Sequence, residues 1–282
     1  MFKLSIQNAY GRTLQLTDVK EYDVESIIGF DPPDARLFES KNTTFDGNKL
    51  NDTTVDDRLI TITLKINGNA EKNRLKLYDY LKIKQKHRIF YSNSSRSVYI
   101  DGILQSMPVG IFDKSEMTQI SFVCNEPYFK DFVEIDADLS NISKLFEFPF
   151  EIETPIPFSE IQVGSGQLLI NKGDVETGMK FKMYAARGAV ENPVIYNLET
   201  GEMLKLNTSM DEGDEIDIVT IFMNKEIKRI RNLEETNLIN RFDNESTWLQ
   251  LRPGGNTFLI NADSGAINLD VYVDVNVLYQ GV

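Results

Sequence analysis

Apolar and polar side chains alternate with a period of two along much of the chain. Near the C-terminus, the odd positions from Ile267 to Tyr279 are apolar, and most of the even positions between them are Asn or Asp. The runs 60–66 and 179–183 repeat this pattern. Because successive side chains of a strand point to opposite faces, each run predicts a strand with one buried and one solvated face. Clusters of Gly, Asn and Asp between the runs predict turns joining antiparallel strands.

One segment departs from this period. Residues 71–86 read EKNRLKLYDYLKIKQK, with Leu75, Tyr78 and Leu81 at helical spacing and Leu77 widening the stripe. We expect one α-helix over about 71–86 in an otherwise mainly β protein. The rest of its surface is basic, which favours a solvated face. The alternative is a contact with an acidic neighbour, such as another copy of the chain.

The regular alternation fades between residues 125 and 157, a stretch that contains four prolines. The charge balance also changes there, from a net charge of −3 over 1–138 to −10 over 139–282. A chain of 282 residues can form two domains of this size. We therefore expect a β-rich domain with the helix at 1–138 and a second, antiparallel β domain at 139–282.

Composition argues against several classes of function. The net charge of −13 disfavours nucleic-acid binding and docking on an anionic membrane. One cysteine and one histidine allow no disulfide within the chain, no thiolate cluster and no metal site with two histidines. The N-terminal residues alternate instead of forming an apolar leader, and no apolar run is long enough to cross a bilayer. We expect a soluble protein without a membrane contact.

Few residues suggest chemistry. His87 has no nucleophile nearby in the sequence, and we expect it at the surface or at the end of the helix. The acids of segment 211–217 lack the spacing of a calcium loop and predict a polar hairpin leading into a strand. Gly164-Ser165-Gly166 lacks the Lys-Ser/Thr of a phosphate loop and predicts a turn. Trp248 is a candidate glycan contact, although its leucine neighbours favour a core position.

A series of short turn motifs follows a definite order along the chain. In the second half these are Asn171-Lys172-Gly173-Asp174, Asn192-Pro193-Val194-Ile195, Glu199-Thr200-Gly201-Glu202, Glu212-Gly213-Asp214-Glu215-Ile216 and Trp248-Leu249-Gln250-Leu251-Arg252-Pro253-Gly254-Gly255-Asn256. In the first half they are Asp31-Pro32-Pro33, Asp46-Gly47, Leu77-Tyr78-Asp79-Tyr80-Leu81 and Glu126-Pro127-Tyr128-Phe129. Their order and spacing resemble the distal tail protein (Dit) family of bacteriophages. Gly178 departs from the family pattern, which often has a proline there, and predicts an altered entry into the following strand.

The resemblance implies a structural protein of the phage virion and not an enzyme. Family members have an N-terminal belt domain and a C-terminal galectin-like β-sandwich, and they form hexameric rings at the distal end of the tail. By this likeness, 1–138 would form the ring and 139–282 the sandwich. The implied partners are other copies of the chain, the tail tube protein, the tail-associated hub protein, and adhesion or receptor-binding baseplate proteins.

The same resemblance implies no catalytic residues, no metal, no cofactor and no nucleic-acid binding, and synthesis in the cytoplasm of the bacterial host. Two other functions stay open from the residues. A carbohydrate-binding module would use Trp248 with Tyr184, Tyr196 and Tyr272 in predicted strands. A hydrolase of cell-wall polysaccharide would need a carboxylate pair, whose spacing is three-dimensional and is not selected by the sequence.

Overall fold

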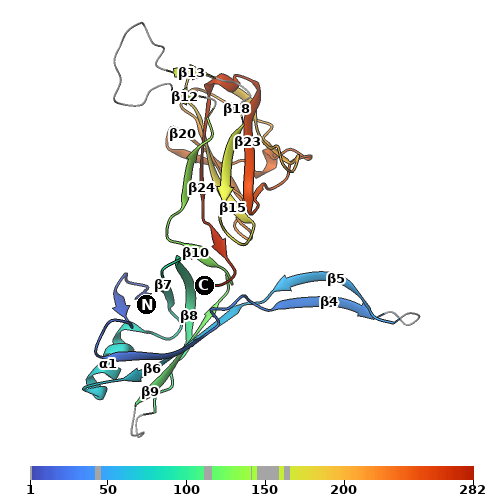
Figure 1. Cartoon of the computed structure of the whole chain (residues 1–282). Helices are drawn as coiled ribbons and strands as arrows, with labels where there is room; N and C mark the ends of the chain where they lie inside the picture. Colours follow the sequence, from blue (N-terminus) through green and yellow to red (C-terminus); the bar gives the residue numbers. More distant parts are fainter. Residues whose placement is uncertain (1, 42–45, 111–115, 141, 145–158, 162–165) are drawn as a thin grey trace, which may run out of the picture. The chain divides into compact units, whose positions relative to one another are not determined.

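The computed structural model describes all residues except 1, 42–45, 111–115, 141, 145–158 and 162–165 (Figure 1). Contacts divide the chain into two compact units: unit 1 is 1–132 with 278–282, and unit 2 is 133–277. The boundary expected from the sequence lies at 138/139, whereas this division lies at 132/133 and residues 278–282 return to unit 1. Among the described residues, no helix is both long and apolar enough to cross a membrane.

The largest sheet of unit 1 is antiparallel and has the strand order β2-β1-β7-β8-β9-β6-β3. Its strands are β1 (Lys3–Asn8), β2 (Thr13–Gln15), β3 (Tyr22–Ile28), β6 (Arg58–Ile66), β7 (Lys86–Ser92), β8 (Ser97–Ser106) and β9 (Met117–Cys124). The short strand β10 (Phe129–Asp131) pairs with β8 and with the returning strand β25 (Leu278–Tyr279). Alternation in 60–66 is confirmed, because the even-numbered side chains there are buried.

The predicted helix is present as α1, Ala70–Tyr80, but it ends before residue 86. Asn69 caps its N-terminus by accepting a hydrogen bond from the amide of Lys72. At its other end Leu81 takes an extended conformation, and β7 begins at Lys86. Strand pairing with β1 and β8 therefore overrides the helical spacing of the last predicted turn.

The buried face of α1 also differs from the predicted stripe. Leu77 and Leu81 are buried, together with the polar Asn73 one turn earlier, whereas Leu75 is exposed. Asn73 is satisfied because its side chain donates to the carbonyl of Asn67. Positions 73, 77 and 81 recur every four residues, which places them on one face of the helix.

A separate two-stranded hairpin leaves the main sheet of unit 1 between β3 and β6. It consists of β4 (Ala35–Lys41) and β5 (Asn48–Val55), which among the described strands pair only with each other (Figure 1). Every residue of β4 is exposed, as is every residue of β5 except the partly buried Val55. The hairpin therefore buries almost nothing within the described chain.

Unit 2 contains two antiparallel sheets. The first has the order β11-β24-β15-β19-β20-β21, with β22 on β15, and comprises β11 (Ile135–Asp138), β15 (Thr177–Ala185), β19 (Glu215–Val219), β20 (Glu226–Arg231), β21 (Glu234–Asn237), β22 (Gln250–Leu251) and β24 (Leu269–Val275). The second has the order β14-β23-β16-β17, with β18 on β16, and comprises β14 (Gln167–Asn171), β16 (Val190–Asn197), β17 (Met203–Lys205), β18 (Ser209–Met210) and β23 (Gly254–Ser264). A small pair, β12 (Ile142–Lys144) and β13 (Ser159–Ile161), and the 3-10 turns Ile239–Arg241 and Ala266–Asn268 complete the unit.

The two sheets of unit 2 share one apolar core, as expected for a β-sandwich. Buried residues of β15 in the first sheet and of β16 and β23 in the second belong to a single cluster. Phe181 and Phe258 meet edge to face between the sheets, with ring centroids 6.3 Å apart. In β24 the odd positions are buried as predicted, while Ile267 lies in a 3-10 turn and is exposed. The mainly β fold with a sandwich is confirmed.

Candidate interaction surface

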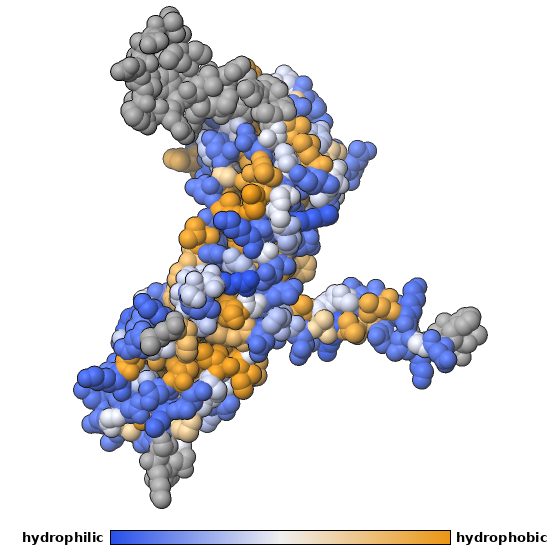
Figure 2. All heavy atoms as spheres, viewed as in Figure 1, coloured by the Kyte–Doolittle hydropathy of each residue, from blue (hydrophilic) through white to orange (hydrophobic). Residues whose placement is uncertain are grey.

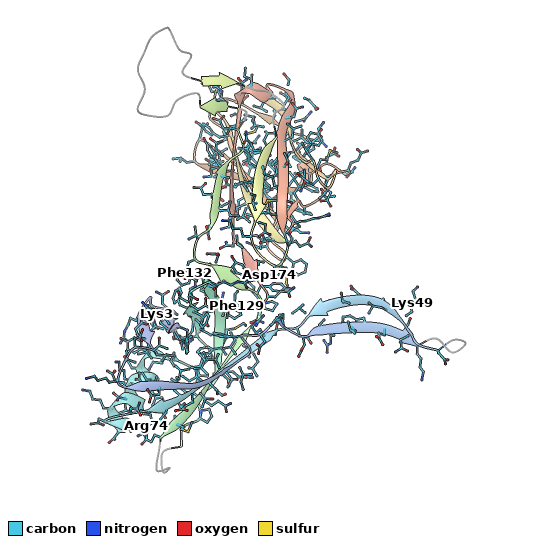
Figure 3. All side chains as sticks on the ribbon, viewed as in Figure 1. Lys3, Lys49, Arg74, Phe129, Phe132 and Asp174 are labelled. Atoms are coloured by element: carbon cyan, nitrogen blue, oxygen red, sulfur yellow. The ribbon has the colours of Figure 1, made fainter. Side chains whose placement is uncertain are left out.

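The exposed hairpin β4–β5 carries apolar side chains on both of its faces. A register shift follows Phe38, so that Phe38 lies opposite Asp52 and the next residue, Glu39, lies opposite Leu50. Leu50 therefore shares the face of Glu39 and Leu37, whereas Phe38 projects from the other face. Phe38, Leu37 and Leu50 are all exposed. Apolar and polar residues are interspersed along the hairpin (Figure 2), whereas charged residues such as Lys49 extend from it into solvent (Figure 3). An isolated two-stranded hairpin is at best marginally stable in water.

Arg58 anchors the base of this hairpin. Its guanidinium donates to four backbone carbonyls: those of Pro127 at 2.5 Å, Gly29 and Asp31 at 2.7 Å, and Gln280 at 2.6 Å. These carbonyls belong to the connection between β3 and β4, to the exit of β9 and to residues 278–282. One buried cation at the start of β6 thus fastens three other stretches of unit 1.

Burial and an aromatic ring define the environment of this arginine. Arg58 is only 4 % exposed, and burial lowers the pKa of its guanidinium. The ring of Phe129, labelled in Figure 3, lies 4.8 Å from the guanidinium carbon. Gly29 has φ +89°, and a Cβ there would lie 2.1 Å from the carbonyl oxygen of Leu59. Glycine is therefore required where the chain turns into the hairpin.

Arg58 is not among the candidate site residues expected from the sequence, although the sequence contains a signal for it. Arg58 is in phase with Ile60, Ile62 and Leu64, which all point into the core. An arginine at an inward position of a strand needs polar partners. Its partners are carbonyls, which every residue has, so the sequence does not reveal which ones it binds.

A hollow lies at the root of the hairpin. Its lining combines prolines with four aspartates, and consists of Gly29, Asp31, Pro32, Pro33, Asp34, Ala35, Arg36, Asp56, Asp57, Arg58 and Leu59. Arg36 pairs with Asp56 at 3.4 Å, and both side chains are exposed. Because Arg58 is directed to carbonyls, the hollow presents a surplus of negative charge.

The single histidine is not at the surface, so that expectation is wrong, while the backbone of Tyr80, the last residue of α1, lies close to its ring. His87 is buried inside β7, opposite Gly102 of β8, and its Nδ1 lies 2.9 Å from the carbonyl oxygen of Gln85. Burial lowers the pKa of His87, which favours the neutral ring. A Cβ at Gly102 would lie 2.9 Å from the Sγ of Cys124. The missing side chain at Gly102 therefore makes space for its neighbours in this layer.

Cys124 is buried in β9, and burial raises the pKa of its thiol to about 12. The thiolate is the nucleophilic form of cysteine. A thiol with this pKa stays protonated at neutral pH, so the arrangement of His87 and Cys124 does not activate a nucleophile.

The acidic segment 211–217 forms a turn after β18 and the first residues of β19. β18 pairs with β16 and β19 pairs with β15 and β20, so this turn joins strands of two different sheets. The predicted hairpin is therefore wrong, whereas the strand predicted after it is confirmed. Asp214 is buried and accepts from Nε of Arg231 at 2.7 Å and from the amide of Asp211 at 2.8 Å. Burial raises the pKa of Asp214, but these hydrogen bonds outweigh it and hold the pKa below its usual value. Among the described residues, no three His, Cys, Asp or Glu side chains are grouped to hold a metal ion.

Trp248 is partly buried against the core of unit 2. The ring of Phe242 stacks on it at 4.7 Å with an interplanar angle of 13°, and Nζ of Lys225 lies 5.3 Å from the indole centroid. A stacked ring leaves no room for an ammonium on the same face, so Lys225 covers the other face. A sugar would have to displace Lys225 to stack here, and the glycan contact stays a prediction.

The turn motifs of the second half are held by buried asparagines. Asn171 donates to two carbonyls, at 3.1 and 3.0 Å, and accepts from the amide two residues later. Asn197 accepts from the amides two and three residues later. Asn256 bridges the amide and the carbonyl of Arg252. These motifs are therefore structural, because each asparagine replaces backbone hydrogen bonds in a tight turn.

Two other sequence features concern the residues at which strands begin. Gly178 lies in β15, where a Cβ would approach the backbone of Ile221 to 2.4 Å, so the chain at this strand entry packs closer than a proline would permit. For the segment Gly164-Ser165-Gly166, residues 164 and 165 lie outside the described part. Strand β14 begins at Gln167, which agrees with the prediction of a turn directly before it.

Residues 172–273 match the family described as siphovirus-type tail component, C-terminal domain. This range lies within unit 2 and covers most of the sandwich with most of its asparagine-held turns. Unit 2 is therefore similar to the C-terminal domain of these tail components, and the resemblance inferred from the turn motifs is confirmed. A search of curated protein sequences gives no match.

Solved structures with a similar fold extend the likeness over both units. The Dit protein of phage SPP1 matches with a TM-score of 0.65 and 14% identity, over 98% of this chain and 99% of that one. A chain of the phage P2 baseplate, solved in its activated conformation with calcium, matches with a TM-score of 0.52 and 12% identity, over 98% of each chain. This chain thus shares the fold of these two proteins over nearly its whole length.

Proposed function

We propose that this chain is a structural protein of a phage tail tip that assembles into a hexameric ring through unit 1. The observation that carries this proposal is the exposed hairpin β4–β5, which has apolar residues on both faces and no partner strand outside itself in the described chain. Covering these side chains with a second copy would bury them at a gain of roughly 25 cal/mol per Å². The same hairpin on every copy makes a head-to-tail contact, which can close into a ring.

The fold likeness suggests where such a ring would belong. The SPP1 protein is described as a paradigm of the hub adsorption apparatus in phages that infect Gram-positive bacteria. By analogy, the ring would connect the end of the tail tube to the tail-associated hub protein in the virion, after synthesis in the host cytoplasm. Unit 2 would hold the adhesion or receptor-binding proteins of the baseplate. The role is mechanical, without catalysis, cofactor or nucleic acid.

Negative-stain microscopy and light scattering of the full chain test this proposal. We expect sixfold rings from the wild type and monomers from Phe38→Asp/Leu50→Asp, because charges would replace the covered apolar side chains. The matched control is Leu168→Asp/Ile170→Asp, which changes two exposed residues of β14 in unit 2. A wild type that stays monomeric at high concentration, or rings that survive the hairpin change, would refute the proposal.

A further inference from the structure

Unit 1 carries a basic loop whose charges have no partner within the described chain. Lys82, Lys84 and Lys86 follow α1, and each is exposed and outside every ion pair of the described residues. Ile83, between two of the lysines, is 51% exposed. Lys84 has φ +67°, a left-handed conformation that is unfavourable for a side chain with a Cβ. The loop therefore presents an apolar side chain flanked by cations.

The hollow at the root of the hairpin has the complementary character. Asp31, Asp34 and Asp57 are exposed and form no ion pair among the described residues. Leu59 and the prolines of the lining supply apolar surface beside these carboxylates. A concave, acidic and partly apolar surface thus occurs on the same unit as a convex, basic and partly apolar loop.

The sheet keeps these two surfaces apart within one copy. The strand order β7-β8-β9-β6 puts three strand spacings between the start of β7, next to the loop, and the start of β6, next to the hollow. At roughly 4.8 Å per spacing, the separation is about 14 Å, which is more than one lysine side chain can bridge. The lysines of one copy are thus not placed to neutralise the aspartates of the same copy.

Both surfaces nevertheless lie at the same end of the strands. Cross-strand register links Lys86 to Ile103, Ile103 to Val123 and Val123 to Leu59 in one continuous row. Two copies placed side by side can therefore bring a loop against a hollow without sliding along the strands. A lateral contact at constant level is what a closed ring needs, whereas a shift along the axis would generate a filament.

We propose that the loop Lys82–Lys84 of one copy docks in the acidic hairpin-root hollow of the next copy. This proposal rests on the proposed function and assigns part of its ring interface. Ile83 would contact the prolines and Leu59, while the lysines would face Asp34 and Asp57. Exposed ion pairs contribute mainly to the choice and orientation of partners, so the charges would fix which surfaces meet.

The experiment measures self-association of the full chain by sedimentation velocity, with two charge-reversal variants. Lys82→Glu/Lys84→Glu alters the loop, and Asp34→Lys/Asp57→Lys alters the hollow. We expect each variant alone to associate at least about tenfold more weakly than the wild type, because like charges would then meet. An equimolar mixture should recover assembly, since each altered loop then meets an altered hollow of opposite charge.

The matched control for the loop variant is Lys172→Glu/Lys180→Glu, which makes the same change in net charge as that variant at exposed positions of unit 2. It should associate like the wild type, and circular dichroism should show all variants folded. Raising NaCl from about 50 to about 500 mM should weaken wild-type association more than that of the loop variant.

The outcomes separate this inference from the proposed function. If the wild type forms rings and both charge variants match the control, the ring stands and the docking of loop in hollow is refuted. Failure of the mixture to recover assembly would also refute the pairing of these two surfaces. A wild-type chain that remains monomeric at every salt concentration would overturn the ring and the docking together.

Discussion

Replacing Arg58 by alanine tests the most consequential contact in unit 1. The four carbonyls that it binds would lose hydrogen bonds to a charged donor, each contributing about 1.5 kcal/mol or more. Part of this loss is offset, because the buried guanidinium also carries a desolvation cost, which its lowered pKa reflects. We expect Arg58→Ala to lower the free energy of unfolding of unit 1 by about 4 kcal/mol.

The position of the single tryptophan makes the measurement selective. Trp248 lies in unit 2, so its fluorescence reports that unit, while hydrogen exchange of peptides from 1–132 reports unit 1. With an m-value of about 2 kcal/mol per M, the loss should lower the urea midpoint of unit 1 by about 2 M. The fluorescence transition should stay in place.

Arg36→Ala is the matched control for this experiment. Arg36 also lines the hollow, but its ion pair with Asp56 is more than half exposed on both sides. Such a pair contributes about 0–1 kcal/mol, so the midpoint should shift by less than about 0.5 M. An Arg58→Ala midpoint within this range of the control would refute the view that one buried cation fastens the hairpin root.

Three further predictions concern pH and the turns. Because burial lowers the pKa of His87, the unfolded chain binds a proton that the folded chain does not. The free energy of unfolding of unit 1 should therefore be highest above about pH 6.5 and should decrease as the pH falls below it. The urea midpoint of His87→Asn should depend less on pH than that of the wild type, and equal pH slopes would contradict this. Asp214→Asn should lower the free energy of unfolding of unit 2 by about 1–2 kcal/mol at pH 7. Because the pKa of Asp214 is lowered in the folded chain, the stability difference from the wild type should shrink as the pH falls below about 4. A stability difference that does not depend on pH would exclude the ionic cause. Asn256→Ala should lower the free energy of unfolding of unit 2, followed by fluorescence, by about 2 kcal/mol, whereas the exposed Asn261→Ala should change it little. Equal effects of the two variants would disprove the structural role of the motif.

The parts of the fold that were predictable are those with one buried face. In β24 and β6 burial follows the alternation of the sequence, because each strand has a core on one side only. The hairpin β4–β5 has no buried face, so its sequence carries no such alternation and the strands were not predicted. The helix was predicted too long, because spacing alone does not show that Lys86 pairs with Ile103.

The surface that we infer for assembly was only partly visible in the sequence. The sequence shows that the helix region is basic. Only the structure shows that Arg74 and Lys76 form ion pairs whereas Lys82 and Lys84 form none among the described residues. The environments of Arg58 and His87 are hidden in the sequence for a related reason. Arg58 binds carbonyls that include the distant Gln280, and His87 lies in the space beside Gly102 of the neighbouring strand.

The return of strand β25 to unit 1 has a consequence for synthesis on the ribosome. Residues 278–282 supply the strand next to β10 and the carbonyl of Gln280 that Arg58 binds, and they are translated after all of unit 2. Unit 2 can therefore complete its core during elongation, while the earlier-made unit waits for its last strand. Nascent chains would acquire a finished hairpin root only after all of unit 2 has been translated, so unit 1 would become competent for assembly later than its place in the sequence suggests.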